Sequence, residues 1–303
     1  SPRRKSKVSN LHGAAFMVAS MAGFAVEDAF IKGASAQLPP GQIMSMLGLG
    51  GATAFAIWSL RRGETPLPRS LFQGPALYRS ILEAATSLNF IIALSLVPLA
   101  LLTTIMQANP LLVTMGAALF FGAPVGWRRW SAIIIGLIGV LIVVRPFGTA
   151  FELTTLWVVA GAITQSARDL ATRRTPAHVT TLQLSTAGFG VMVPTGIIVC
   201  VMFGTPPVWP SLVNWGYLLA AVGIGIPALY AIILANRLGD ISFVAPFRYS
   251  RIVFGLALSV IVFGEVLDGY TLIGAAIIVA SGLYTFAREA RLRRTSPSTK
   301  AAL

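Results

Sequence analysis

The stretch Leu238–Arg288 reads LGDISFVAPFRYSRIVFGLALSVIVFGEVLDGYTLIGAAIIVASGLYTFAR and decides the fold. It contains two apolar runs, Ile241–Phe263 and Tyr270–Phe286, each near the ~20 residues that a helix needs to cross the membrane. Arg248 and Arg251 lie well inside the first run. A cation at that depth costs at least ~2.5–3.5 kcal/mol, so such residues usually face a polar cavity or a partner. The stretch therefore predicts a pair of membrane helices that contribute to a polar site.

A weaker copy of this pattern lies about 142 residues earlier in the chain. There, the apolar run Leu96–Phe121 includes Gln107, Asn109 and Pro110, and the run Trp130–Val144 follows it. We interpret the chain as a helical hairpin unit that is used twice.

The composition is that of a membrane protein: of 303 residues, 55% are hydrophobic and 11% are charged, and the mean hydropathy is +0.78. Soluble chains have nearer a quarter of charged residues. Ten apolar segments follow one another, so we expect an all-α protein with ten transmembrane helices. The segments are Leu11–Ile31, Gln42–Leu60, Pro75–Leu96, Leu99–Phe121, Trp130–Val144, Leu153–Ala171, Leu182–Phe203, Val213–Ala235, Ile241–Phe263 and Tyr270–Phe286.

The beginning of the chain also imitates a secretory signal, because a basic tail and an apolar run precede the small residues 34–36. The run is too long for such a signal, and Glu27, Asp28 and Lys32 intervene before the cleavage site. We therefore expect the first segment to be a retained helix.

Positive charge predicts the topology, with both termini in the cytoplasm. Outside the helices, this arrangement leaves only Lys32 and Arg145 on the outer side. It also explains the net charge of +13 without nucleic-acid binding. The inner group holds 17 of the 23 basic residues: Arg3, Arg4, Lys5, Lys7, Arg61, Arg62, Arg69, Arg128, Arg129, Arg173, Arg174, Arg237, Arg288, Arg291, Arg293, Arg294 and Lys300.

Five helices in each half reverse the direction of the second half, so the halves are expected to be inverted repeats with a site at their interface. The predicted organisation is a cytoplasmic tail at 1–10, a first five-helix repeat at 11–146 and a second repeat at 151–287. A basic tail at 288–303 follows, and we expect it to be disordered.

The sequence contains no motif for ATP binding or hydrolysis, and Gly48–Gly51 lies inside an apolar helix, where close packing explains it. Cys200 is the single cysteine, and His12 and His178 lie near helix ends without ligand-like neighbours. We therefore predict a protein that is not an enzyme and that has no metal and no cofactor.

Two pairs of opposite charges lie inside apolar segments at i,i+4 spacing: Asp28 with Lys32, and Arg79 with Glu83. Residues at this spacing share a helix face, so each pair can neutralise itself within its own helix. Glu27 lies beside the first pair. We consider Glu27, Asp28 and Glu83 candidate proton carriers if transport is coupled, with an internal salt bridge as the structural alternative. Arg168 and Asp169 lie near a cytoplasmic segment end and are assigned either to that end or to the loop.

Segments four and nine are the more informative. The 142-residue spacing sets Gln107 against Tyr249 and Asn109 against Arg251, so both halves offer hydrogen-bonding groups at one depth. Pro110 and Pro227 are predicted bending points. We expect the tyrosines to supply an amphipathic wall and arginine to bind a carboxylate. The predicted substrate-binding residues are Tyr78, Glu83, Gln107, Asn109, Tyr230, Arg248, Tyr249 and Arg251.

The ten-helix layout, together with Phe263-Gly264-Glu265, Gly274 and residues 281–284 (SGLY), resembles the drug/metabolite transporter superfamily. More narrowly, the chain resembles EamA-type ten-helix exporters, among them bacterial aromatic amino acid exporters. The resemblance covers about residues 10–288 and implies export or exchange of amino acids and related metabolites.

Two positions depart from the family pattern. The first repeat has Ala123 where the second has Glu265, and segment nine has Ile252 where a mid-helix proline is usual. The run Phe247–Ser250 also resembles relatives proposed to import riboflavin or S-adenosylmethionine, so the direction of transport stays open.

We therefore expect a multi-pass inner-membrane carrier, monomer or homodimer, that exports small amphipathic metabolites by alternating access. Amino acids with aromatic side chains are the expected substrates, and the lipid bilayer is the expected partner. An uptake carrier for a cofactor-like metabolite is the alternative within transport. A membrane scaffold or receptor that transports nothing is the alternative from another class.

Overall fold

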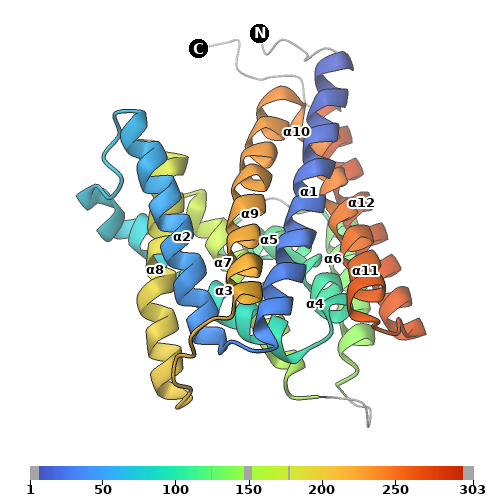
Figure 1. Ribbon diagram of the computed structural model, residues 1–303. Coiled ribbons are helices and arrows are strands. Elements are labelled where there is room, and N and C mark those ends of the chain that lie inside the picture. Colours follow the sequence, from blue (N-terminus) through green and yellow to red (C-terminus); the bar gives the residue numbers. More distant parts are fainter. Residues whose placement is uncertain (1–6, 124, 147–151, 177, 296–303) are drawn as a thin grey trace.

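The computed structural model describes residues 7–123, 125–146, 152–176 and 178–295, and its regular elements are all helices. Figure 1 shows them as one bundle. They are α1 (Lys7–Ser35), α2 (Pro40–Arg61), η1 (Arg69–Phe72), α3 (Gly74–Leu96), α4 (Leu99–Met106), α5 (Asn109–Phe121), α6 (Trp127–Val144), α7 (Thr155–Thr172), α8 (Thr181–Met202), α9 (Leu212–Leu238), α10 (Ile241–Val244), η2 (Ala245–Tyr249), α11 (Ser250–Phe263) and α12 (Gly269–Thr295).

Ten segments cross the bundle, as the sequence predicts. Among the described residues, nine spans are long and apolar enough to cross a membrane, with α4 and α5 counted as one span and η2 and α11 as another. The tenth crossing is α7, which has 18 residues but is less apolar than the others. Arg168 and Asp169 belong to α7 and are the reason for its lower apolar content.

The ends of the chain are more helical than the sequence suggests. The helix α12 continues to Thr295, so the predicted disordered tail is wrong for its first eight residues, 288–295. At the other end, α1 begins at Lys7 and includes the last part of the predicted N-terminal tail. The remaining tail residues, 1–6 and 296–303, lie outside the described residues.

Helix packing repeats between the two halves when each crossing is exchanged with the crossing five further along. The contact of α1 with α9 then becomes that of α3 with α7, and the contact of α1 with α11 becomes that of α5 with α7. Three contacts are their own equivalents: α2 with α8, α6 with α12 and α4 with α11. In Figure 1, α2 and α8 form one flank, α1 and α9 the centre, and α6, α11 and α12 the other flank. Since an odd number of crossings reverses direction, the halves are inverted repeats. The boundaries proposed for them at 11–146 and 151–287 remain predictions.

The helices of the fourth and ninth crossings begin and end at equivalent positions. The helices α4 and α10 begin at Leu99 and Ile241, and α5 and α11 end at Phe121 and Phe263, which in both cases are 142 residues apart. A glycine follows each of the two ends, with φ 62° and ψ 23° in both halves. This left-handed conformation is the one that glycine adopts at helix C-termini without a Cβ penalty.

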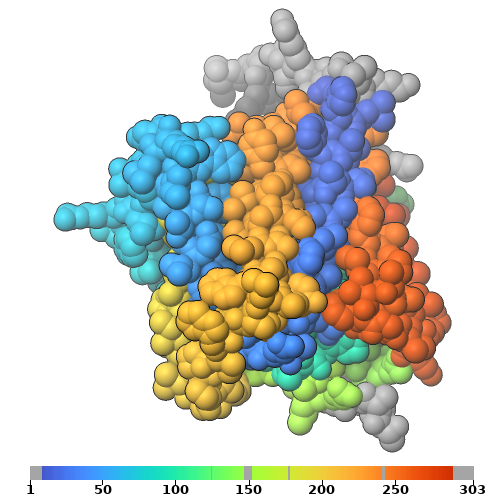
Figure 2. All heavy atoms as spheres, viewed as in Figure 1, coloured from blue at the N-terminus to red at the C-terminus, as the bar shows by residue number. Residues whose placement is uncertain are grey.

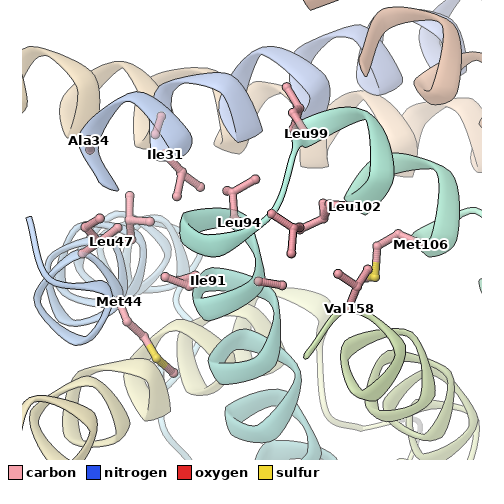
Figure 3. Close-up of a cluster of buried hydrophobic side chains, with 14 of the residues drawn as sticks. Ile31, Ala34, Met44, Leu47, Ile91, Leu94, Leu99, Leu102, Met106 and Val158 are labelled. Carbon is pink, nitrogen blue, oxygen red and sulfur yellow. The ribbon is translucent and has the colours of Figure 1, made fainter. Parts of the chain in front are cut away.

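The largest hydrophobic core lies at one end of the bundle. It combines the last turns of α1 and α3 with the first turns of α2 and α4. Figure 3 shows Ile31 and Leu94 at its centre, with Leu47, Leu99 and Leu102 around them. Inside a membrane, such a cluster is held by close packing, because lipid tails are as apolar as leucine. This end of the bundle is therefore densely filled.

Candidate functional site: a charged cavity between the two halves

Two of the crossing helices are broken at the same depth. The α4–α5 helix is interrupted at Gln107 and Ala108, and the ninth crossing contains the 3₁₀ turn η2 between α10 and α11. Pro110 in the first turn of α5 and Pro246 in the first turn of η2 lack the N–H that a continuous helix needs. The sequence predicted a bend at Pro110 but no break in segment nine, because Pro246 lies closer to the segment's beginning.

A cavity of about 470 Å³ lies where these breaks meet α1, α3, α7, α8 and α9. On the face drawn in Figure 2, α9 lies between α1 and α2 and closes that side. The volume falls in the range typical of small-molecule sites. Of the residues predicted from the sequence, the cavity lining includes Glu27, Asp28, Glu83, Gln107, Asn109, Pro110, Arg248, Tyr249 and Arg251.

Three other predicted residues lie elsewhere. Tyr78 is 68% exposed, and Tyr230 is 41% exposed and packs on Trp58 with ring centroids 5.5 Å apart. Pro227 lies inside the continuous helix α9, outside the cavity lining. The structure thus corrects the expectation that these two tyrosines form a wall of the site.

Asp28 binds across the two halves. Its carboxylate accepts a hydrogen bond from the guanidinium of Arg251 at 2.5 Å, which joins α1 to α11. The predicted pairing of Asp28 with Lys32 is therefore wrong, because Lys32 points the other way, toward Glu265 at 3.7 Å. Arg251, in another helix, is placed to bind Asp28, whereas the i+4 neighbour Lys32 is not.

A second charged network joins α3 to α7. Arg79 and Glu83 form the predicted i,i+4 pair at 2.8 Å, and Glu83 also binds Arg168 at 2.9 Å. Arg168 in turn binds Asp169 at 2.9 Å. The possible loop assignment for Arg168 and Asp169 is corrected, since both lie in α7 and line the cavity. The detectable signal was a pair of opposite charges inside a segment otherwise apolar enough to be a helix.

The breaks are hydrogen-bonded to these networks. Asn109 donates to Asp169 at 2.9 Å and accepts from the hydroxyl of Ser166 at 2.7 Å. The side-chain amide of Gln107 donates to the backbone carbonyl of Arg248 at 3.2 Å, which connects the two breaks directly. The backbone groups that lose their helical hydrogen bonds at each break therefore lie next to side chains that hydrogen bonds hold in place.

Aromatic rings form the apolar part of the lining. Phe24, Phe90 and Phe189 line the cavity together with Tyr249. Tyr249 is buried, its ring packs edge-on against Phe286, and its hydroxyl finds no hydrogen-bond partner among the described residues. Tyr249 was predicted from the sequence, whereas the three phenylalanines were not, because no pattern separates them from ordinary core residues.

The cavity extends toward one end of the bundle only. Its lining reaches Thr172 at the end of α7 and Ser185 in the second turn of α8, at the end where α1 begins. The opposite end is filled by the hydrophobic core. There, Lys32 also donates to the backbone carbonyl of Val97 at 2.7 Å, while Glu265 accepts from the N–H of Leu99 at 2.7 Å. Charged side chains from both halves therefore hold the filled end together through hydrogen bonds and an ion pair.

A second cavity, of about 880 Å³, lies between α2, α8 and the loop before α9. Trp209, Trp215 and Pro206 are among its lining residues, and the lining contains no charged side chain. Although it is larger and also lies between helices of both halves, we assign the site to the central cavity, because that cavity contains the charged side chains and both breaks.

Residues 11–145 match the EamA-like transporter family. This match covers the first five crossings, and the packing of the second five repeats theirs. The chain is thus similar to transporters of the drug/metabolite superfamily, and the family match itself covers its first half. With its ten crossings, it is a multi-pass protein of the bacterial inner membrane.

Curated members of this superfamily resemble the chain at moderate identity. A protein of Vibrio cholerae named riboflavin transporter is 28% identical over 181 residues, which are 58% of this chain and 59% of that protein. The pseudopaline exporter CntI of Pseudomonas aeruginosa is 26% identical over 266 residues, covering 85% of this chain and 90% of CntI. The chain thus spans just under three fifths of the length of the first relative and nearly all of the second. A protein of Rickettsia bellii named S-adenosylmethionine uptake transporter is 25% identical over 196 residues, which are 65% of this chain and 66% of that protein, so uptake and export both occur among the names of the relatives.

The fold also matches a solved structure. A crystal structure covers 92% of this chain with a TM-score of 0.58 and 22% sequence identity, and 99% of that protein is included. At this identity the likeness concerns the fold alone. It supports the ten-helix architecture described above.

Proposed function

We propose that the chain is a secondary transporter that exports amino acids, chiefly aromatic ones, across the inner membrane by alternating access. The observation that supports this best is the central cavity, which is built from both halves, charged, and closed at one end. Sites at the interface of inverted repeats, beside broken helices, are typical of secondary carriers.

The lining suits an amphipathic solute. Phe24, Phe90 and Phe189 offer apolar ring surface, and both signs of charge line the same space. An aromatic amino acid has a flat apolar side chain and a polar end with both charges, so it matches both features. Under the predicted topology the cavity faces the cytoplasm, from which an exported solute is loaded.

The alternative within transport is uptake of riboflavin. The Vibrio cholerae relative and the ring-lined cavity favour this candidate. Counterflow in proteoliposomes separates the candidates: vesicles are loaded with one unlabelled solute, and accumulation of labelled phenylalanine or labelled riboflavin is followed. We expect phenylalanine and tryptophan to drive accumulation of labelled phenylalanine, and riboflavin to leave it unchanged. Counterflow of riboflavin alone would replace our proposal, and no counterflow of any solute would favour a scaffold.

Direction is tested in cells with a toxic analogue. An exporter of aromatic amino acids should protect cells that express it from 4-fluorophenylalanine, whereas an importer should sensitise them. Empty-vector cells are the control, and sensitisation would overturn the exporting direction.

Coupling to protons is proposed for Glu27, Asp28 and Glu83, which all line the cavity. Ionisable residues inside a membrane are frequent in proton relays. An imposed pH gradient across proteoliposomes should then drive accumulation of phenylalanine beyond equilibrium. Accumulation that stops at equal concentrations on both sides would show facilitated diffusion instead.

A further inference from the structure

The central cavity is lined by equal numbers of acidic and basic side chains, but not all of them form ion pairs. Four acidic and four basic side chains line it, so their formal charges cancel. If all eight were paired with one another, the site would offer no charge to a ligand. The eight are Glu27, Asp28, Glu83, Asp169, Arg79, Arg168, Arg248 and Arg251.

Six of the eight are held in ion pairs between 2.5 and 2.9 Å long. One pair joins Asp28 to Arg251, and the other four residues form the network of α3 and α7. Glu27 and Arg248 are left. Neither side chain makes an ion pair or a hydrogen bond through its charged group within the part of the chain that the structure describes.

The nearest charges around these two are already engaged. Glu27 interacts at longer range with Asp28 and Arg251, which bind each other. Arg248 interacts at longer range with Asp169, which is bound by Arg168 and Asn109, and with the like charges of Arg168 and Arg251. One carboxyl group and one guanidinium in the same cavity therefore lack a contact partner.

The two side chains belong to adjoining elements from different halves. Glu27 is in α1 and Arg248 in η2, and these two elements pack against each other. Uncompensated charge inside the membrane is costly, and it is retained where a ligand or ion supplies the missing partner. A ligand with a carboxylate and an ammonium group that reaches both side chains across the cavity would compensate both.

We infer that Arg248 binds the carboxylate of the substrate and that Glu27 binds its ammonium group, so the site selects zwitterions. This inference rests on the proposed function, and it assigns the two residues that determine specificity. A guanidinium presents paired donors that match a carboxylate, which suits Arg248 to its part. The rings of Phe24 and Phe90 then remain for the substrate's side chain.

The test uses analogues that lack one charged group. Phenylalaninamide has no carboxylate, and 3-phenylpropionate has no ammonium group. Each competes with labelled phenylalanine for counterflow in proteoliposomes of the intact protein, Arg248→Gln and Glu27→Gln. The matched control is Asp28→Asn, which neutralises the adjacent carboxylate that is already paired with Arg251.

The intact protein should bind phenylalanine more tightly than either analogue by a factor on the order of 100, the usual consequence of leaving one charged group of a binding site without its partner. In Arg248→Gln the preference over phenylalaninamide should disappear, while the preference over 3-phenylpropionate stays. Glu27→Gln should show the opposite pattern. Asp28→Asn should lower transport without removing either preference. A variant that transports nothing is scored by thermal stabilisation of the purified protein by each ligand, which measures binding without turnover.

Outcomes separate this inference from the proposed function. Phenylalanine counterflow with both preferences unchanged in Arg248→Gln and Glu27→Gln would overturn the inference and leave amino acid transport intact. Absence of phenylalanine counterflow and of thermal stabilisation in the intact protein would overturn the proposed function itself. Loss of both preferences in Asp28→Asn would also overturn the inference, because it would assign the effect to general charge.

Discussion

The carboxylate of Glu265 accepts hydrogen bonds from the backbone N–H groups of Leu99 at 2.7 Å and of Ala100 at 3.0 Å. It thereby satisfies the free N-terminal donors of α4 from the opposite half of the chain. At the equivalent position, 142 residues earlier, the first half has Ala123, which has no group to do the same. The two ends of the bundle are thus built alike but are held closed with different strength.

Removal of this carboxylate should loosen the filled end. In a Cys200→Ser background, Ala34→Cys places a thiol in the hydrophobic core, where Ala34 has no exposed surface. We expect Glu265→Ala to raise the rate at which a membrane-impermeant maleimide labels Ala34→Cys by about 10-fold or more, because hydrogen bonds to charged groups are worth about 1.5–3 kcal/mol. An unchanged labelling rate, with folding retained, would show that Glu265 does not hold this end closed.

Introducing the missing carboxylate should have the opposite effect. Ala123→Glu places an acid at the position equivalent to Glu265, beside the end where the cavity lies. We expect it to favour the conformation in which that end is closed, so labelling at Ser185→Cys in the cavity should fall and labelling at Ala34→Cys should rise. Ala123→Gln is the control without charge. A fall at both reporter positions would point to misfolding, and no change at either would contradict the equivalence.

The ion pair of Asp28 with Arg251 should stabilise the junction of the halves. Either Asp28→Asn or Arg251→Gln leaves a charge without its partner, for which a loss of about 3–5 kcal/mol is typical at buried sites. The double variant Asp28→Asn/Arg251→Gln should recover a large part of the loss. Thermal unfolding of the purified protein measures this, and additive losses in the double variant would show that the two residues act independently.

Close contact between α2 and α8 should depend on Gly48. A Cβ at Gly48 would lie 2.8 Å from the carbonyl oxygen of Phe189 and 2.9 Å from the Cβ of Met192. Gly48→Ala should therefore destabilise the protein by about 1–3 kcal/mol through overpacking. The control is Gly190→Ala in α8, where a Cβ would meet nothing within 4 Å. It should be neutral or stabilising by up to ~1 kcal/mol because alanine favours helix, and equal losses in both variants would contradict the packing argument.

Sequence reasoning found the parts of this molecule that depend on local pattern. Apolar runs predicted the ten crossings, and the spacing between Leu96–Phe121 and Ile241–Phe263 predicted the repeat. Gln107 and Arg248 were identified because polar groups inside apolar segments need a reason. Each of these signals lies within one helix or in the comparison of two segments.

Ion pairs between residues of different helices could not be predicted from such local patterns. The i,i+4 rule assigned Asp28 to Lys32, but folding brought Arg251 and Glu265 to them from 223 and 233 residues away. Whether a charge pairs locally depends on which helices adjoin, and the spacing of residues within one helix does not show this. For the same reason, the sequence did not decide whether Arg168 belongs to a helix end or to a loop, because its partner Glu83 lies in another helix.

The central claim is that the cavity between the two broken helices is the transport site. The most direct measurement is uptake of labelled phenylalanine into proteoliposomes, comparing the intact protein with Arg248→Ala and Gln107→Ala. The account predicts uptake by the intact protein, its loss in Arg248→Ala and a clear reduction in Gln107→Ala, with both variants folded. Uptake that is equal in all three proteins would contradict the account, since it would place the path of the substrate outside this cavity.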